Sequence, residues 1–150
     1  MKTIMAGNKV VVVSGGFDPI HSGHIAMFKA ANELGRVTVI LNSDKFLLKK
    51  KKYLVMPFKE RKAVLESIRY VDKVVRCIDK DQTVCNTLAK LKPDIFANGG
   101  DRTLKNIPET EICKKFGIKM VFNTGGGKAN SSSKIIHSLI ARLIDGMIAK

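Results

Sequence analysis

Two histidines, His21 and His24, stand three residues apart in the segment Gly15-Gly16-Phe17-Asp18-Pro19-Ile20-His21-Ser22-Gly23-His24. Side chains three residues apart in the first turn of a helix lie on one side of it, so both imidazoles can face one ligand. A helix N-terminus adds unpaired N–H groups and the positive end of the helix dipole, which attract anions. The pattern predicts a site for a phosphate group, and its lining residues are assigned as Gly15, Gly16, Phe17, Asp18 and Gly23. Gly23 has no Cβ, which would let a phosphate approach the backbone closely.

A zinc site is the competing interpretation of the histidine pair, since histidines at this spacing can share a metal. Zinc needs three or four ligands and supporting hydrogen bonds. His137 is the only other histidine, and Cys77, Cys85 and Cys113 have no metal-ligand spacing. Phosphate handling is therefore favoured, and the cysteines are expected to be reduced thiols of a cytoplasmic protein.

Asp18 lies three residues before His21. Its carboxylate could orient an imidazole or help to position Mg²⁺ on a triphosphate, and it is our candidate metal ligand. It could also form an Asx turn before Pro19, and these roles are compatible.

A run of four lysines, Lys49 to Lys52, follows the second predicted strand. Such a run often forms a solvated face. Its place at the binding edge of a sheet favours instead a flexible lid over an anionic substrate. Lys50 and Lys52 are the favoured contacts.

Two glycine-containing loops complete the candidate site. In the first, Gly99 and Gly100 let the backbone approach a ligand, and Asp101 could accept a sugar hydroxyl or bind a metal, although a tight turn would explain the same residues. The second contains Lys128 and leads into Ser131, Ser132 and Ser133. One serine would suffice to cap the following helix, so three indicate a second phosphate cradle facing the histidines.

Apolar runs alternate with helix-period segments along the chain, which predicts one α/β domain with a five-stranded parallel sheet and helices on both faces. We expect a loose tail over residues 1–8 and the domain over residues 9–150. The predicted strands are 9–13, 37–41, 73–76, 95–97 and 119–122, and the predicted helices are 23–34, 57–68, 83–91, 109–116 and 132–148. In such a sheet, ligands bind beyond the carboxyl ends of the strands, where all the loops above should meet.

The net charge of +14 over 150 residues fits a polyphosphate substrate, a nucleic acid or an anionic surface. A nucleic-acid-binding module remains the alternative of another class. It lacks a recognition motif and leaves the histidine pair unexplained, so we do not expect a nucleic acid as partner. The sequence has no apolar run of about 18 residues and no signal-peptide cleavage site, so we expect no membrane association.

The segment from Gly16 to His24 resembles the signature nucleotide-binding motif of the cytidylyltransferase-like nucleotidyltransferase superfamily. Two further parts of the chain resemble glycerol-3-phosphate cytidylyltransferases. One is Glu60–Lys62 together with Ile68–Val74, and the other is the Ser131–Ile135 motif. The segment Lys92–Asp101 is more similar to the adenylyltransferase domain that makes ADP-heptose.

The resemblance implies a Rossmann-like fold of the adenine nucleotide alpha hydrolase-like (HUP) type, often a homodimer, with Mg²⁺ as cofactor. It implies that a substrate phosphate attacks the α-phosphorus of a nucleoside triphosphate and releases pyrophosphate. Carried over by position, His21 and His24 stabilise charge on the triphosphate, and Lys50 and Lys52 reach its phosphates. The remaining roles implied are acceptor-phosphate binding by Arg69, β- and γ-phosphate binding by Ser131–Ser133, and nucleoside contact by Asp101.

The chain departs from the cytidylyltransferases where Gly126-Gly127-Lys128-Ala129 stands in place of Arg-Thr-Glu-Gly. This departure bears on whether CTP or ATP is the substrate. The resemblance as a whole implies transfer of a nucleoside monophosphate, with CMP favoured, to a small phosphorylated polyol or sugar. An ATP-using adenylyltransferase acting on a sugar phosphate is the alternative, favoured by the loop after residue 97.

Overall fold

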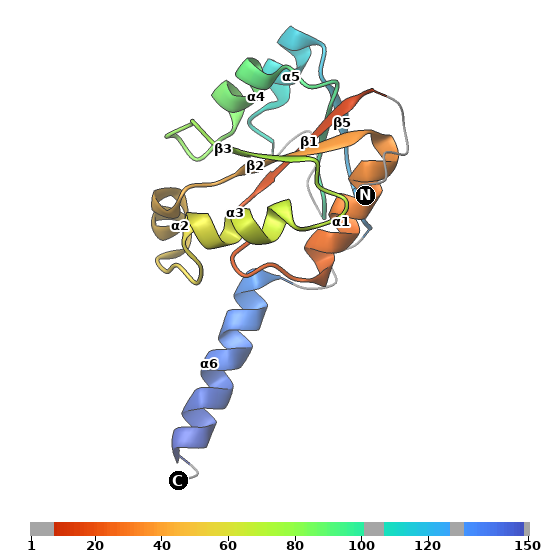
Figure 1. Cartoon of the computed structure of the whole chain (residues 1–150). Helices are drawn as coiled ribbons and strands as arrows, with labels where there is room; N and C mark the ends of the chain where they lie inside the picture. The colour runs from red at the N-terminus through yellow and green to blue at the C-terminus, as the bar shows by residue number, and fades with distance from the viewer. Residues whose placement is uncertain (1–7, 101–106, 127–130, 149–150) are drawn as a thin grey trace.

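Five parallel strands form one sheet in the order β3-β2-β1-β4-β5 (Figure 1). The computed structural model describes residues 8–100, 107–126 and 131–148. The strands are β1 Val10–Gly15, β2 Arg36–Leu41, β3 Lys73–Arg76, β4 Ile95–Ala97 and β5 Lys119–Val121. The predicted five-stranded parallel sheet is confirmed, and each predicted strand agrees with the observed one to within two residues. The tail predicted over residues 1–8 lies almost wholly outside the described residues.

The winding of the sheet changes direction at β1, which has β2 on one side and β4 on the other. The chain builds outward from β1 through β2 to β3, and then crosses back to add β4 and β5 on the other side. A crevice opens at such a switch point because the loops after the two neighbouring strands diverge. The histidine segment follows β1, so it lies at this crevice.

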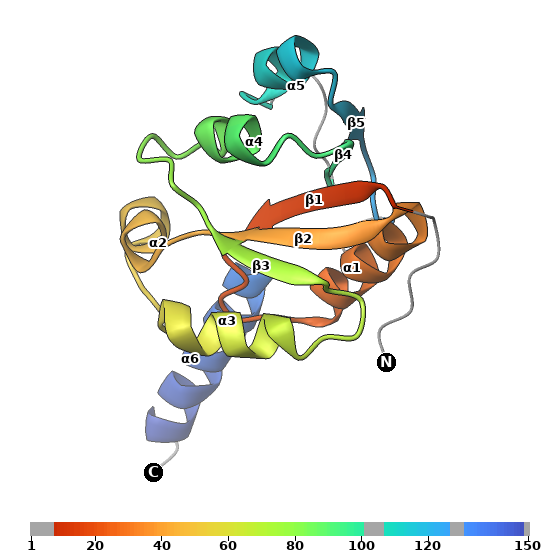
Figure 2. The ribbon, with the colours of Figure 1, turned by 45° about the horizontal axis from the view of Figure 1, so that its top comes forward.

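Helices cover both faces of the sheet (Figure 2). Helices α1 (Ser22–Leu34) and α3 (Phe58–Glu66) lie on one face, and α4 (Cys85–Leu91) and α5 (Thr110–Phe116) lie on the other. Successive side chains of a strand point to opposite faces. Val11 and Val13 therefore pack with Phe28 of α1, whereas Val12 packs with Leu88 of α4. Burying a side chain of this size contributes about 1.5–3 kcal/mol, so the run of valines anchors both layers.

The lysine run forms a helix rather than the predicted flexible lid. Helix α2 spans Asp44–Lys51 and begins at Ser43, whose Oγ accepts a hydrogen bond from the Phe46 N–H at 3.1 Å. Asp44 lies in the first turn and lysines fill the last, which complements the helix dipole at both ends. The prediction of a loop here was wrong because the run was interpreted by its charge alone.

Helix α6 (Ser132–Ile148) leaves the body of the molecule near the carboxyl end of β1 and projects away from it (Figures 1 and 2). Its bounds agree with the predicted helix. Among the described residues, no helix is both long enough and apolar enough to span a membrane. Asp101 and Lys128, two of the predicted site residues, lie outside the described residues.

Candidate active site

The two histidines begin helix α1 and cap it with their own side chains. Nδ1 of His21 accepts a hydrogen bond from the Gly23 N–H at 3.1 Å, and Nδ1 of His24 accepts one from the His21 N–H at 3.1 Å. The arrangement is a reciprocal capping box built from imidazoles. Because Nδ1 is the acceptor in both rings, each neutral imidazole carries its proton on Nε2. Each ring can thus donate a hydrogen bond to an anion from Nε2.

The orientation of the imidazoles is fixed by packing. The His21 and His24 rings stack with their centroids 3.8 Å apart, and the ring of Phe17 meets His24 edge-on at 4.9 Å. A Cβ on Gly23 would lie 2.8 Å from Cε1 of His21. The glycine therefore makes room for the His21 ring, and the predicted approach of a phosphate to its backbone stays a prediction.

The glycines before the histidines allow helix α2 to pack closely. A Cβ on Gly16 would lie 2.5 Å from a methyl group of Leu47, and one on Gly15 would lie 3.0 Å from the Phe17 ring. Phe17 itself is buried and contacts Phe28 in the core. These residues hold the histidine loop against the sheet.

Asp18 is buried and ties the histidine loop to the segment between α2 and α3. Its two carboxylate oxygens accept hydrogen bonds from the N–H groups of Val55 (2.8 Å) and Met56 (2.6 Å). Nζ of Lys51 lies 3.2 Å from Oδ2 and donates to the Asp18 carbonyl at 2.5 Å. With its oxygens engaged in this way, Asp18 does not fit a metal ligand. Nor do the described residues contain a cluster of three or more His, Cys, Asp or Glu side chains that could hold a metal.

The lysine that reaches the histidine loop is Lys51. Lys50 is exposed and lies over the Phe46 ring, with 5.8 Å from Nζ to the ring centroid, and Lys52 is the exposed C-cap of α2. In a helix, Lys51 shares a side with Leu47, which faces the glycine turn. The helical form of the run thus decides which ammonium group is brought in. The phosphate contacts assigned to Lys50 and Lys52 stay predictions.

Arg69 is not brought to the site. It lies between α3 and β3, where the Asp72 N–H bonds to the carbonyl of Val37 near the start of β2. This is the amino edge of the sheet, whereas the histidines follow the carboxyl end of β1. The assignment of Arg69 to acceptor binding is therefore corrected: α3 runs back along the sheet and leaves its last turn at the opposite edge.

Arg61, in the first turn of α3, lies at the carboxyl edge of the sheet beside the histidine loop, and it is 1% exposed. Its guanidinium donates to the carbonyls of Gly16 (2.9 Å), Asn42 (2.8 Å) and Met56 (2.9 Å) and pairs with Asp44 at 2.6 Å. It thereby joins the loops after β1 and β2 to the start of α3. The sequence offered one signal for this burial, the four-residue spacing to the core residue Leu65, which places both on one side of the helix.

The serine-rich start of α6 lies against the histidine loop. Oγ of Ser132 donates a hydrogen bond to the carbonyl of Pro19 at 2.7 Å, and Oγ of Ser131 accepts one from the Lys134 N–H at 3.1 Å. Two segments more than 100 residues apart thus meet at one edge, as the two-cradle hypothesis requires. Ser131 caps the helix, Ser132 ties it to the loop, and Ser133 is exposed. Binding of phosphate by these hydroxyls stays a prediction.

The loops after β4 and β5 pack on the second turn of α1. The Thr124 N–H bonds to the carbonyl of Asn98 at 3.0 Å, and a Cβ on Gly99 would lie 3.1 Å from the sulfur of Met27. Gly125 adopts φ +86°, and a Cβ there would lie 2.7 Å from the Met27 nitrogen. Gly100 adopts φ +63°.

Thr124 carries a further polar atom at this place. Its Oγ1 is buried and has no hydrogen-bond partner among the described residues. Sequence reasoning missed this threonine, since a lone Thr in a glycine loop gives no signal.

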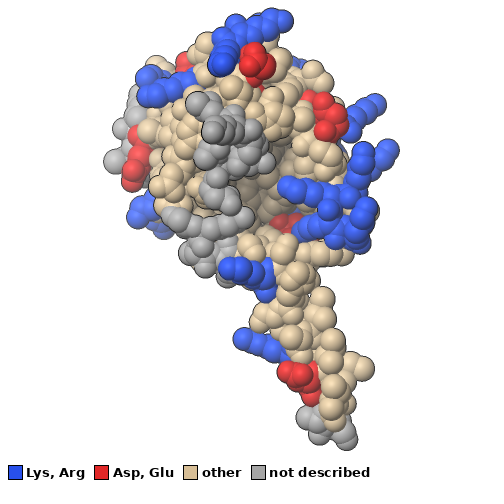
Figure 3. Space-filling view, turned by 180° about the vertical axis from the view of Figure 1, so that it is seen from behind, with Lys and Arg blue, Asp and Glu red and all other residues tan. Residues whose placement is uncertain are grey.

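Lysine and arginine side chains gather on one flank of the face above the root of α6, beside a hollow (Figure 3). The histidine loop, the start of α6 and the loops after β4 and β5 share this edge of the sheet. A basic flank beside a crevice raises the local concentration of anionic substrates. The arrangement is suited to hold a polyphosphate.

Comparison with known proteins agrees with this chemistry. Residues 12–138 match the family described as cytidylyltransferase-like. The chain is 37% identical over 120 residues to the FAD synthase of Pyrococcus abyssi, a match that covers 77% of this chain and 80% of that protein. It is 32% identical over 141 residues to the bifunctional protein HldE of Pelobacter propionicus, covering 91% of this chain but 28% of HldE.

A solved structure shows the same fold. The lipopolysaccharide core biosynthesis protein from Thermoplasma volcanium superposes with a TM-score of 0.66 at 26% identity, covering 77% of this chain and 96% of that one. The sequence match spans the strands and helices that build the site, together with the start of α6. The chain therefore belongs to the cytidylyltransferase-like family and is a nucleotidyltransferase.

Proposed function

We propose that this protein transfers the adenylyl group of ATP to the phosphate of a small acceptor and releases pyrophosphate. The observation that carries the proposal is the pair of stacked imidazoles, each with its proton on Nε2, at the start of α1 and beside the start of α6. ATP is supported by the relatives named FAD synthase, because FAD contains an adenine nucleotide. The similarity of residues 92–101 to the ADP-heptose-forming domain supports it as well.

The chemistry asks for positioning and charge neutralisation more than for a base. An oxygen of the acceptor phosphate attacks the α-phosphorus, the bond between that phosphorus and the bridging oxygen breaks, and pyrophosphate leaves with the bonding electron pair. The attacking oxygen is already ionised at neutral pH. The obstacle is the meeting of two anions, which the Nε2–H donors of His21 and His24 and the α1 N-terminus would relieve.

The anchoring of Nδ1 matters for this role. A ring held through Nδ1 cannot rotate to another hydrogen bond without breaking the cap of α1. The Nε2 donors are consequently preorganised, and the transition state is stabilised without the cost of orienting them.

The second candidate is the reaction that the sequence alone favoured, with CTP as donor and a phosphorylated polyol as acceptor. The Ser131–Ile135 motif supports it through its likeness to glycerol-3-phosphate cytidylyltransferases. Against it stands the segment at residues 126–129, which lacks the arginine of those enzymes.

Three further expectations belong to this proposal. Mg²⁺ would arrive with the triphosphate, and no step is assigned to it because Asp18 is engaged elsewhere. A homodimer is expected on the resemblance, and a cytoplasmic location is expected from the odd number of cysteines without metal-ligand spacing. Nucleic acid is not expected as a partner.

Pyrophosphate release tests the proposal directly. The four nucleoside triphosphates are each combined with Mg²⁺ and with FMN, a sugar 1-phosphate or glycerol 3-phosphate. ATP-dependent release that requires an acceptor would support adenylyl transfer, and release with CTP alone would replace it by the second candidate. A thermal-shift screen of the same nucleotides separates failure to bind from use of an untested acceptor, because a ligand that binds only the folded state raises its stability. If no nucleotide stabilises the protein and none releases pyrophosphate, the proposal is wrong.

A further inference from the structure

A hollow of about 570 Å³ lies between α2 and the segment that follows β3 (Figure 2). We call it the α2–β3 hollow. Its lining comes from two parts of the chain, residues 43–49 at the start of α2 and residues 76–82 at the end of β3 and beyond it. Ligand pockets of proteins commonly have volumes of about 300–1,000 Å³. A hollow of this size with walls from two elements can enclose a small molecule.

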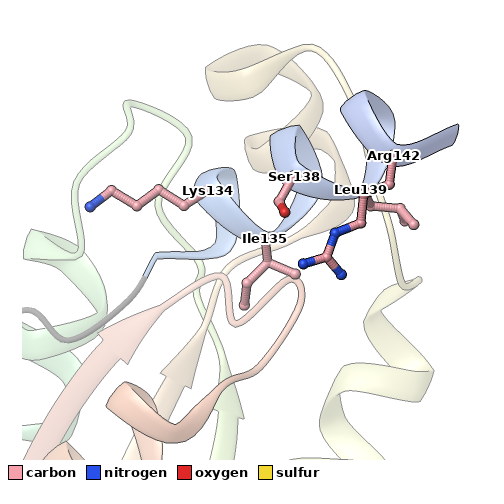
Figure 4. A pocket seen from close by; sticks show the side chains of 5 residues that line it. All are labelled: Lys134, Ile135, Ser138, Leu139 and Arg142. Atoms are coloured by element: carbon pink, nitrogen blue, oxygen red, sulfur yellow. The ribbon is translucent and has the colours of Figure 1, made fainter. Parts of the chain in front are cut away.

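The hollow along α6, about 530 Å³, is of a different kind. Figure 4 shows its lining residues, which are Lys134, Ile135, Ser138, Leu139 and Arg142. All of them belong to one helix, so the hollow has no opposite wall and a ligand there would stay largely in solvent. The α2–β3 hollow is therefore the stronger candidate for a binding site.

Four basic side chains line the α2–β3 hollow, and none of them forms an ion pair with another described residue. They are Lys45, Lys49, Arg76 and Lys80. The acidic residue of the lining, Asp79, is already engaged at the start of α4. Its carboxylate accepts hydrogen bonds from the Asn86 N–H at 2.7 Å and from the Thr87 hydroxyl at 2.6 Å. Positive charges gathered around one small space favour a ligand with more than one negative charge.

The lining also offers apolar surface on both of its walls. Phe46 belongs to the α2 wall, and Ile78, which is 49% exposed, belongs to the β3 wall. The guanidinium of Arg76 is held in place over the Phe58 ring, 3.7 Å from the ring centroid. A flat apolar body would cover Phe46 and Ile78 while its acidic groups meet the basic side chains. A polyol would instead place hydroxyl groups against apolar surface and leave them without partners.

We propose that the α2–β3 hollow is a second ligand site, separate from the nucleotide site, for a small flat aromatic molecule that carries two or more negative charges. Leu47 and Lys51 face the histidine loop. Lys45, Phe46 and Lys49, which line the hollow, occupy the other side of α2 by helical position. Because the helix stands between the hollow and the histidine loop, a molecule bound there is neither the triphosphate nor the acceptor.

A ligand in the hollow acts on the nucleotide site through α2, a consequence that rests on the proposed function. The helix has only eight residues, so its contacts keep it formed. A molecule that bridges α2 and residues 76–82 adds contacts on the outer side of the helix. Leu47 and Lys51 are then held more firmly against Gly16 and Asp18 in the histidine loop. Binding of the ligand and binding of the nucleotide therefore strengthen one another.

Naphthalene-1,5-disulfonate is a probe that tests the site by itself, because it is flat, carries two permanent negative charges and has no phosphate that could act as acceptor. Calorimetric titration of the full chain without nucleotide should give a Kd of roughly 1 mM or below. Succinate, a dianion without a ring, should bind at least about tenfold more weakly, since it cannot cover the apolar part of the lining. A Kd of the probe above roughly 10 mM, or equal Kd values for the probe and succinate, would overturn the proposal.

Variants of the lining locate the bound probe. Lys45→Gln/Lys49→Gln removes two of the positive charges and should raise the Kd of the probe on the order of tenfold. Both positions are exposed and glutamine has a similar helix propensity, so α2 should remain folded. Ile78→Asp places a negative charge in the apolar part of the lining and should weaken binding by a similar factor. The matched control Lys114→Gln/Lys115→Gln removes two charges from the last turn of α5 and should bind the probe as the wild type does. Wild-type affinity in both lining variants would overturn the proposal.

The link to the nucleotide is measured separately, by titration of MgATP or MgCTP with and without a saturating concentration of the probe. The Kd of the nucleotide should fall about threefold or more when the probe is bound. An unchanged Kd would refute the coupling and leave the second site standing. Competitive displacement of the probe by the nucleotide, or by a compound that accepts the nucleotidyl group, would show that the hollow is not a separate site and would overturn the proposal. Failure of every nucleotide to bind a protein that binds the probe would refute the proposed function alone.

Discussion

At the scale of single residues, His21 and His24 serve two purposes with different ring atoms. Nδ1 of each ring satisfies a backbone N–H of α1, and Nε2 carries the proton that can meet an anion. An aspartate could cap the helix equally well, but its carboxylate carries no donor, and a serine would have its single O–H donor on the same atom that caps the helix. The histidines thus couple the geometry of the helix start to the proposed chemistry.

His24 gives the sharpest test of this coupling. His24→Ala should lower kcat by about 10²-fold or more, the effect of losing one preorganised donor. His24 occupies the third helical position, where glutamate also reaches back to the cap. His24→Glu should therefore keep the thermal stability and, because a carboxylate has no donor, still lose most of the activity. His137→Ala, on exposed α6, is the control, and steady-state pyrophosphate release at saturating substrate is the measurement. Turnover near the wild-type value in His24→Ala would contradict the role.

Arg61 shows how a buried charge can organise a site without touching the substrate. Replacement by methionine would remove the donor for Asp44 and for the carbonyls of Gly16, Asn42 and Met56. Asp44 is itself 38% exposed, so the loss comes mainly from the carbonyls, and a buried acceptor left without its donor costs about 1–3 kcal/mol. We expect Arg61→Met to lose stability of this order in urea unfolding. Arg69→Met, at an exposed position, should change it by less than about 0.5 kcal/mol. A larger loss of stability in Arg69→Met than in Arg61→Met would show that Arg61 does not hold these loops together.

At the scale of elements, α2 positions the site through its inner side. Leu47 packs on Gly16 and Lys51 pairs with Asp18, so the helix holds the histidine loop from outside the sheet. Its opposite side, with Lys45, Phe46 and Lys49, lines a separate hollow beside the end of β3. The helix has only eight residues, and its formation therefore depends on its cap and on these contacts.

Removal of the α2 cap should weaken nucleotide binding at the site. Ser43→Ala deletes the acceptor of the Phe46 N–H and should cost about 0.5–2 kcal/mol of stability. Because Lys51 then holds Asp18 less firmly, KM for the nucleotide should rise while kcat changes little. Ser67→Ala, which removes a hydroxyl from the exposed end of α3, is the matched control. Unchanged stability and KM in Ser43→Ala would show that α2 does not support the site.

At the scale of the whole molecule, the helices on the α4 and α5 side enclose the thiols. All three cysteines are free, as expected, with Cys77 and Cys113 buried. Burial, helped by the nearby charge of Glu109, raises the pKa of the Cys113 thiol from 9.0 to about 11. Burial likewise raises the pKa of Cys77 and of Cys85. These thiols are protonated at neutral pH and serve as packing groups.

The raised pKa of Cys113 makes stability depend on alkaline pH. The folded state keeps the Cys113 proton up to about pH 11, whereas the unfolded chain releases it above pH 9.0. The contribution is therefore complete below pH 9.0 and is lost as the pH rises towards 11. Urea unfolding from pH 8 to 11 should show a steeper loss of stability in the wild type than in Cys113→Ala. If the free energy of unfolding fell equally with pH in both proteins, the pKa of Cys113 would not be raised by folding.

The sheet, five of the helices, the histidine turn and the serine start of α6 could be predicted before folding, because they depend on local periodicity, turn chemistry and capping. Which charges belong to the site could be learned only from the folded chain. Lys51 and Arg61 approach the histidine loop, and Arg69 does not, because the direction of α3 and the side of α2 that faces the turn are set by packing between segments far apart in the chain. A charged side chain looks the same in the sequence whether it is solvated or buried. The difference arises only when distant carbonyls converge on it, as those of Gly16, Asn42 and Met56 do on Arg61.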